Sequence, residues 1–117
     1  ADFCFNLQSD MKNSKANELI AKIIKEVESN SVNVDALIPM LTELREMAKM
    51  EQDPLITRSI RLVMEHLNEN GGWEYQTLED SEEVEENLTY LISLYAKSEN
   101  KYNRDEIREI ANAMTGL

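Results

Sequence analysis

DPLITRSIRLVMEHLNENGG, residues 53–72, contains the signals of one complete amphipathic helix. Asp53 can cap the helix, and Pro54 stands at the first helical position, where a missing backbone donor costs least. The apolar residues that follow recur at helical spacing: Ile56, Ile60, Val63 and Leu67. Gly71 and Gly72 end the pattern, because glycine readily adopts the left-handed conformation that closes a helix. The stretch therefore predicts a helix over residues 55–69 that packs one face against a core.

Two helices are predicted before this one, because apolar residues recur there with the same period. They are Leu19, Ile20, Ile23, Ile24 and Val27 in residues 16–29, and Leu37, Ile38, Leu41, Leu44, Met47 and Ala48 in residues 34–51. Asn33 or Asp35 is available to cap the second of these helices. Pro39 lies near its start, where it can bend the first turn.

Residues 73–79 lead to a fourth predicted helix. Asp80 and Glu83 have the spacing of a capping box. The apolar stripe after them is Val84, Leu88, Leu91, Ile92 and Tyr95. Residues 73–79 are predicted to be an ordered loop, because a lone strand would have no partner. Three of their side chains can fold back over the core: Trp73, Tyr75 and Leu78.

A short fifth helix is predicted to begin at Asn103, which forms a second capping-box pattern with Glu106. Tyr102 and Ile107 stand where a hydrophobic staple would place them. The apolar face of this helix is Ile107, Ile110, Ala111 and Met114.

These elements predict an all-α fold, a compact bundle of four to five mostly antiparallel amphipathic helices. Connections other than residues 70–80 are short, so consecutive helices should pack as antiparallel neighbours. The 117 residues are enough for one domain. We assign residues 13–117 to this domain and residues 1–12 to a flexible N-terminal segment. Met11 is typical of a translation start, so residues 1–10 are either native or derived from a vector.

Composition excludes several classes of protein. The single cysteine, Cys4, cannot form an intramolecular disulfide, and no apolar run is long enough to cross a membrane. With 12 Lys and Arg against 23 Asp and Glu, the formal net charge is -11, which opposes direct binding to nucleic acid. We therefore expect a cytoplasmic protein that binds neither membranes nor nucleic acids.

The negative charge is concentrated in one part of the chain. Residues 62–96 contain no Lys or Arg. They hold the acids Glu65, Glu69, Glu74, Glu79, Asp80, Glu82, Glu83, Glu85 and Glu86, which carry -9 of the net -11. Two interpretations are open. The acids can be a solvated surface that also favours a helix N-terminus, or they can be a docking patch for a basic partner.

The docking hypothesis places a partner-binding site around residues 69–86. The aromatic residues would serve as anchors, since such side chains are common at interaction hot spots. The predicted partner-binding residues are Trp73, Glu74, Tyr75, Glu79, Asp80, Glu82 and Glu83.

No catalytic or metal-binding pattern is present in the sequence. His66 is the only histidine, and we interpret it as a partly exposed residue near a helix C-terminus. An EF-hand with Gly71 or Gly72 at its sixth position would need Glu where Thr77 or Leu78 stands. We therefore expect no enzyme activity, no cofactor and no specific metal site, although weak calcium binding by the acids stays open.

The leading functional hypothesis is a small non-enzymatic interaction module, an adaptor or regulatory subunit, that presents the acidic surface to a basic protein partner. The alternative is an inhibitor or immunity-type protein whose acids block a basic, nucleic-acid-binding cleft. Its binding would weaken steeply with salt and compete with nucleic acid. Homodimerisation through a helix face is a third case.

Overall fold

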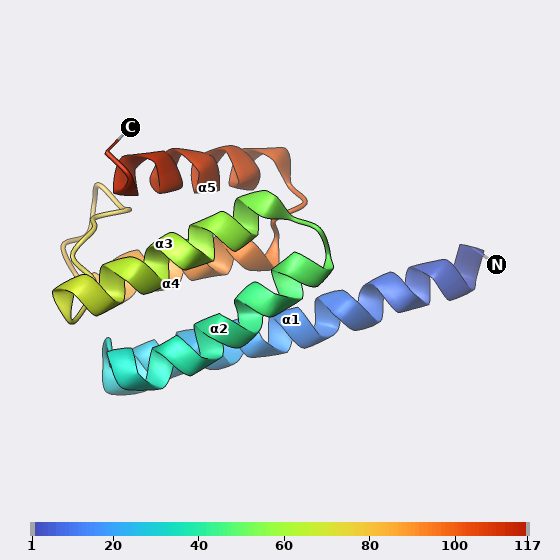
Figure 1. The fold of residues 1–117 in the computed structure, drawn as a ribbon, viewed down its shortest axis with the longest axis horizontal. Coiled ribbons are helices and arrows are strands. Elements are labelled where there is room, and N and C mark those ends of the chain that lie inside the picture. Colours follow the sequence, from blue (N-terminus) through green and yellow to red (C-terminus); the bar gives the residue numbers. More distant parts are fainter. Residues whose placement is uncertain (1, 117) are drawn as a thin grey trace.

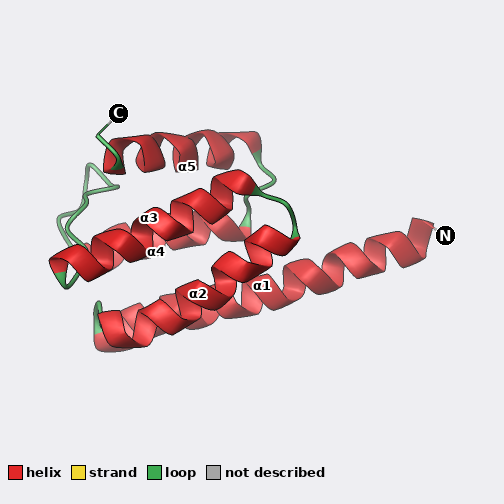
Figure 2. Cartoon of the chain, viewed as in Figure 1, coloured by secondary structure: helices red, strands yellow, loops and turns green. Residues whose placement is uncertain are grey.

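The protein is all-helical over the part that the structure describes. The computed structural model describes the backbone of residues 2–116 and the side chains of residues 14–116. Five helices occupy this backbone, and no strand occurs in it (Figure 2). They are α1 (Asp2–Asn30), α2 (Val34–Met50), α3 (Pro54–Asn70), α4 (Val84–Ala96) and α5 (Lys101–Met114). The predicted all-α bundle is confirmed.

The helices form a closed ring around the core, in the order α1, α2, α3, α5, α4. Each helix reverses the direction of the one before it in the chain (Figure 1), so ring neighbours are antiparallel except for α3 and α5. Consecutive helices are ring neighbours except for α3 and α4, which both pack against α5 and meet each other across the core. The long connector, residues 71–83, makes this order possible by carrying the chain from the end of α3 to the start of α4.

The core is built from the apolar stripes that the period predicted, except for Val84, which is 39% exposed. Its fully buried large side chains are Ile23, Val27, Leu37, Leu41, Ile60, Val63, Leu67, Leu88, Leu91, Ile92 and Ile107. Two polar residues are buried among them, Ser59 and Asn87. The hydroxyls of Ser59 and Tyr95 lie 2.6 Å apart and form a hydrogen bond between α3 and α4. Burial raises the pKa of the Tyr95 phenol, so this hydroxyl stays protonated.

Helix α3 begins and ends where the sequence indicates. The Asp53 carboxylate accepts a hydrogen bond from the Ile56 amide at 3.3 Å, and Pro54 occupies the first turn. Gly71 adopts the left-handed conformation, with φ 69°, and its amide bonds to the Leu67 carbonyl. Helix α2 begins at Val34 as predicted, but the side chain of its N-cap residue, Asn33, makes no capping bond.

The two predicted capping boxes are wrong. Helix α4 begins after Glu83, whose side chain makes no capping hydrogen bond. Helix α5 is capped by Asn100, three residues earlier than predicted, and the Asn100 amide oxygen accepts from the backbone amides of Tyr102 and Asn103 at 2.8 and 3.3 Å. The Tyr102 side chain is 82% exposed, so the predicted staple with Ile107 does not form.

Helix α1 begins far before the predicted start at residue 16. Its backbone is helical from Asp2, and Figure 1 shows its first turns extending past the other helices. The assignment of residues 1–12 to a flexible segment ahead of a domain at 13–117 stays a prediction. Residue 1 and the side chain of Cys4 lie outside the described part. Over the described residues, no helix is long and apolar enough to cross a membrane.

Candidate functional site

The connector between α3 and α4 is anchored by Trp73. Its side chain is only 2% exposed, and its ring lies 4.7 Å from the His66 ring and 6.3 Å from the Tyr75 ring, measured between centroids. Burial of this large aromatic side chain removes apolar surface from water, which stabilises the folded state. Trp73 is therefore part of the core, and its role as a partner anchor stays a prediction. The prediction that the connector folds back over the core is confirmed for this residue.

His66 holds the next residue of the connector. Its Nε2 atom accepts a hydrogen bond from the Glu74 amide at 3.0 Å. His66 is half-buried near the end of α3, as predicted, and its ring also holds the connector.

Asn87 fixes the second half of the connector. It is 2% exposed, and its side-chain nitrogen donates to the carbonyls of Ser81 at 3.0 Å and Glu83 at 2.8 Å. Its side-chain oxygen accepts from the Leu78 amide at 2.6 Å. The Thr77 hydroxyl donates to the Asn87 backbone carbonyl at 2.7 Å. One buried amide therefore holds both flanks of the bend at residues 79–80.

Sequence reasoning missed Asn87, although a signal was present. Asn87 stands four residues before Leu91 and next to Leu88, both in the apolar stripe of α4. An amide at such a position is buried and requires hydrogen-bond partners. The connector at residues 71–83 directly precedes α4, and its backbone N–H and C=O groups are not used in a helix. It is therefore the nearest source of such partners.

The predicted acidic residues lie on the surface of this anchored connector. Glu74, Glu79, Asp80, Glu82 and Glu83 are all exposed. Among the residues whose side chains the structure describes, none of the five forms an ion pair. Tyr75 is half-buried and packs against the core, so it presents only part of its ring.

Two further acids continue this surface into the first turn of α4. The Glu85 carboxylate accepts from the Ser31 hydroxyl at 2.7 Å, which lowers the pKa of Glu85. This bond ties the start of α4 to the turn between α1 and α2. The Glu86 carboxylate accepts from the Ser81 hydroxyl at 2.6 Å. The positive end of the α4 dipole stabilises both charges. We call Glu74, Glu79, Asp80, Glu82, Glu83, Glu85 and Glu86 the acidic end of the molecule.

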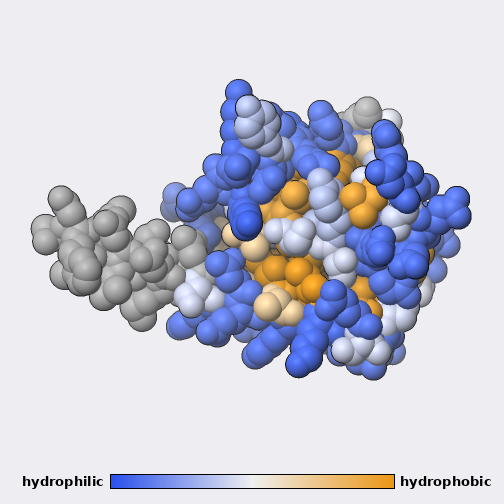
Figure 3. All heavy atoms as spheres, turned by 180° about the vertical axis from the view of Figure 1, so that it is seen from behind, coloured by the Kyte–Doolittle hydropathy of each residue, from blue (hydrophilic) through white to orange (hydrophobic). Residues whose placement is uncertain are grey.

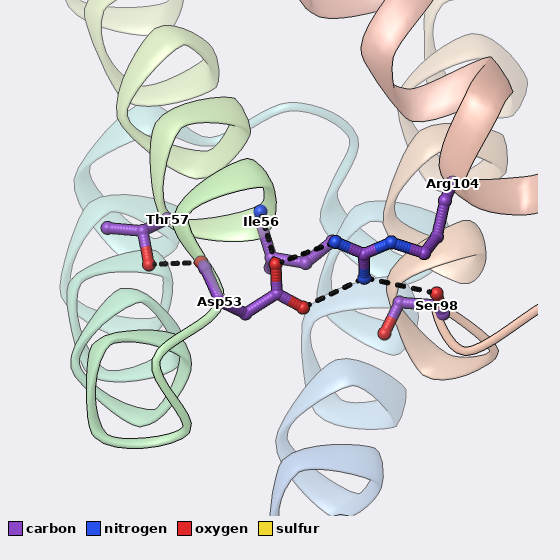
Figure 4. Close-up of polar contacts among 5 residues, drawn as sticks. All are labelled: Asp53, Ile56, Thr57, Ser98 and Arg104. Carbon is purple, nitrogen blue, oxygen red and sulfur yellow. Dashed lines mark hydrogen bonds and ion pairs between the residues drawn. The ribbon is translucent and has the colours of Figure 1, made fainter.

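An ion pair between Asp53 and Arg104 joins two turns at the opposite end of the bundle, and we call this pair the clasp. Figure 4 shows Arg104 of α5 facing Asp53, with Nη1 3.0 Å from Oδ2 and Nη2 3.1 Å from Oδ1. Arg104 also donates to the Ser98 carbonyl at 3.3 Å. The guanidinium lowers the pKa of Asp53, and the carboxylate raises the pKa of Arg104. The clasp joins the α2–α3 turn to the α4–α5 turn.

A cleft of about 620 Å³ opens beside this clasp. It is lined by Ala16, Asn17, Glu51, Asp53, Tyr95, Ala96, Lys97, Ser98, Glu99, Asn100 and Arg104. Its lining mixes both signs of charge, and the Arg104 guanidinium is already paired with Asp53. Over the described side chains, no three His, Cys, Asp or Glu residues converge as a metal-binding group. The three acids and two bases of the lining leave the cleft with a formal charge of only -1.

In comparisons with known proteins, no family model, no curated protein and no solved structure matches the chain.

Proposed function

We propose that this protein is a non-enzymatic interaction module, an adaptor or regulatory subunit, whose acidic end binds a basic surface of a protein partner. The observation that carries the proposal is the combination of charge and order at this end. Five connector acids are exposed and form no ion pair with the described residues, and the segment that bears them is held by Trp73, His66 and Asn87.

Order in the connector favours binding. A loop that becomes ordered only on association loses conformational entropy, which lowers affinity. Here the hydrogen bonds of Asn87 and the burial of Trp73 hold the backbone before any partner arrives. A fixed array of like charges also raises the association rate with a basic surface and disfavours acidic ones.

The experiment compares two variants with the same change in charge. The first neutralises the acidic end with Glu79→Gln, Asp80→Asn, Glu82→Gln and Glu83→Gln. The control neutralises four exposed acids elsewhere: Glu18→Gln, Glu43→Gln, Glu99→Gln and Glu109→Gln. Proteins captured from native lysate by the wild type are identified at low salt, and the affinity of each purified partner is then measured at low and moderate salt.

We expect a partner that binds the wild type and the control variant and loses affinity for the acidic-end variant. Retention by all three proteins would overturn the proposal, because the binding surface would lie elsewhere. Absence of any partner would overturn it in favour of a solvated surface. A partner whose binding falls steeply with salt and competes with DNA or RNA would identify the inhibitor or immunity-type alternative.

A further inference from the structure

An apolar hollow lies beside the acidic end, on the face formed by α1 and α4. Its volume is about 300 Å³, and it is lined by Ile24, Leu78, Glu86, Thr89, Tyr90 and Ser93. Figure 3 shows apolar side chains gathered in the middle of this face, surrounded by hydrophilic ones. The hollow therefore combines the apolar side chains of Ile24 and Leu78 and the Tyr90 ring with the polar Glu86, Thr89 and Ser93.

The geometry of the hollow suits a helix. Glu86, Thr89, Tyr90 and Ser93 follow the spacing of one helix face, so α4 provides one continuous wall. Ile24 of α1 lies opposite, because α1 and α4 are neighbours in the ring. A third helix packs in the groove between two such helices by inserting side chains spaced three and four residues apart.

The charge around the hollow selects a basic occupant. Glu86 is the only charged residue of its lining, and Ser81 holds one oxygen of its carboxylate at 2.6 Å. Leu78, at the connector end of the hollow, is followed by the exposed acids Glu79 and Asp80. A second copy of this chain would bring its own net charge of -11 to the same rim, which disfavours self-association there.

We propose that the hollow between α1 and α4 binds the apolar face of a basic amphipathic helix, with Lys or Arg of that helix meeting Glu86 and the neighbouring acids. This inference rests on the proposed function, since it assigns the recognition element of the basic partner. The apolar contacts supply affinity that salt does not screen, and the acidic end supplies orientation.

The test uses a labelled synthetic peptide of about 18 residues, long enough to form a helix, with Leu at i, i+3, i+4 and i+7 and Lys elsewhere. Two control peptides have either the same composition with shuffled leucines or Glu in place of Lys. Binding is measured by fluorescence anisotropy against the wild type and two variants. Ser93→Arg fills the hollow, whereas Thr42→Arg adds the same charge on α2. Both residues are exposed, and each hydroxyl bonds to a carbonyl of its own helix.

We expect Ser93→Arg to weaken binding of the amphipathic Lys peptide about tenfold or more relative to Thr42→Arg, and the control peptides to bind weakly to every protein. Thermal unfolding checks that both variants fold. Equal affinity of the two variants would overturn this inference. If the acidic-end variant still lost binding in that case, the proposed function would keep its support.

Two other outcomes would also overturn the inference. One is failure of the amphipathic Lys peptide to bind the wild type, since a basic helix is the occupant proposed. The proposed function would then depend on the lysate experiment alone, which uses the native partner. The other is a wild-type dimer in light scattering that Ser93→Arg dissociates, because the hollow would then be an interface between copies of the chain.

Discussion

At the scale of single residues, Asn87 has the largest structural consequence for the acidic end. Its side chain satisfies two carbonyls and one amide of a connector that has no regular structure of its own. Asn87→Ala should lower the free energy of unfolding by about 1–3 kcal/mol, because buried polar groups would lose their partners. Denaturant unfolding measures this change, and faster amide exchange in residues 77–83 would locate it.

The control for this substitution is Asn68→Ala. Asn68 is exposed on α3, and its replacement should change stability by less than about 0.5 kcal/mol. Equal effects of the two substitutions would contradict the role of Asn87 in holding the connector.

Trp73 provides a second prediction at this scale. Trp73→Ala should cost about 3–5 kcal/mol, because it leaves a cavity in the core. Trp73→Phe should cost less, since the indole Nε1 makes no hydrogen bond to the described residues. Because Trp73 is the only tryptophan, its emission should shift to longer wavelength on unfolding. Trp73→Phe should also keep the affinity for a partner, and a large loss of affinity in this folded variant would identify Trp73 as a contact residue.

The sequence revealed the candidate surface residues but not the residues that hold the connector, and the difference has a physical reason. Trp73 and the acids were visible as residue types, but exposure depends on tertiary packing, so the same tryptophan fitted both a core and a surface role. The acids of the candidate surface followed from composition alone. Asn87 and His66 act through backbone groups of a connector whose path no local pattern describes.

At the scale of elements, prediction succeeded where one strong local signal stood alone. Asp53, Pro54 and Gly71 each carry a clear signal for a helix end, and α3 begins and ends at them. The start of α5 offers two asparagines, Asn100 and Asn103, and spacing does not decide which one caps the helix. The order of α3, α5 and α4 in the ring likewise depends on core packing among all five helices.

The Asp53–Arg104 clasp gives a pH-dependent prediction for these elements. The hydrogen bonds from Arg104 lower the pKa of Asp53 in the folded protein from its ordinary value of 3.8, so folding is favoured while the carboxylate is charged. This contribution is fully present above the unfolded pKa and is lost as the pH falls through the lower, folded pKa. Asp53→Asn should therefore cost up to about 1 kcal/mol near neutral pH and progressively less in acid below about pH 4.

Unfolding free energies of the wild type and Asp53→Asn, measured from neutral pH to about pH 2, check this dependence. In an Arg104→Gln background the Asp53→Asn substitution should have a smaller effect at neutral pH, since the partner charge is gone. A difference between wild type and variant that grows as the pH falls would show the opposite sign and contradict the assignment.

At the scale of the whole molecule, charge and architecture are arranged together. The ring order requires a long connector between α3 and α4, and this connector carries acids that no basic residue in the stretch 62–96 can offset. The clasp and the mixed-charge cleft lie at the other end of the bundle. The molecule thus has one strongly negative end and one nearly balanced end, which is the basis for orienting it on a basic partner.

The last prediction concerns the stability cost of this arrangement. Unpaired like charges held close together repel, and each neighbouring pair costs a few tenths of a kcal/mol. Salt screens the repulsion, so the free energy of unfolding of the wild type should rise with added NaCl.

Neutralising the four acids at residues 79, 80, 82 and 83 should raise the free energy of unfolding at low salt and reduce its dependence on salt. The matched variant at residues 18, 43, 99 and 109 should change both less, because those acids are spread over the surface among basic residues. If the acidic-end variant were instead less stable at low salt, the acids would be stabilising the start of α4 through the helix dipole, and the solvated-surface interpretation would account for them without a partner.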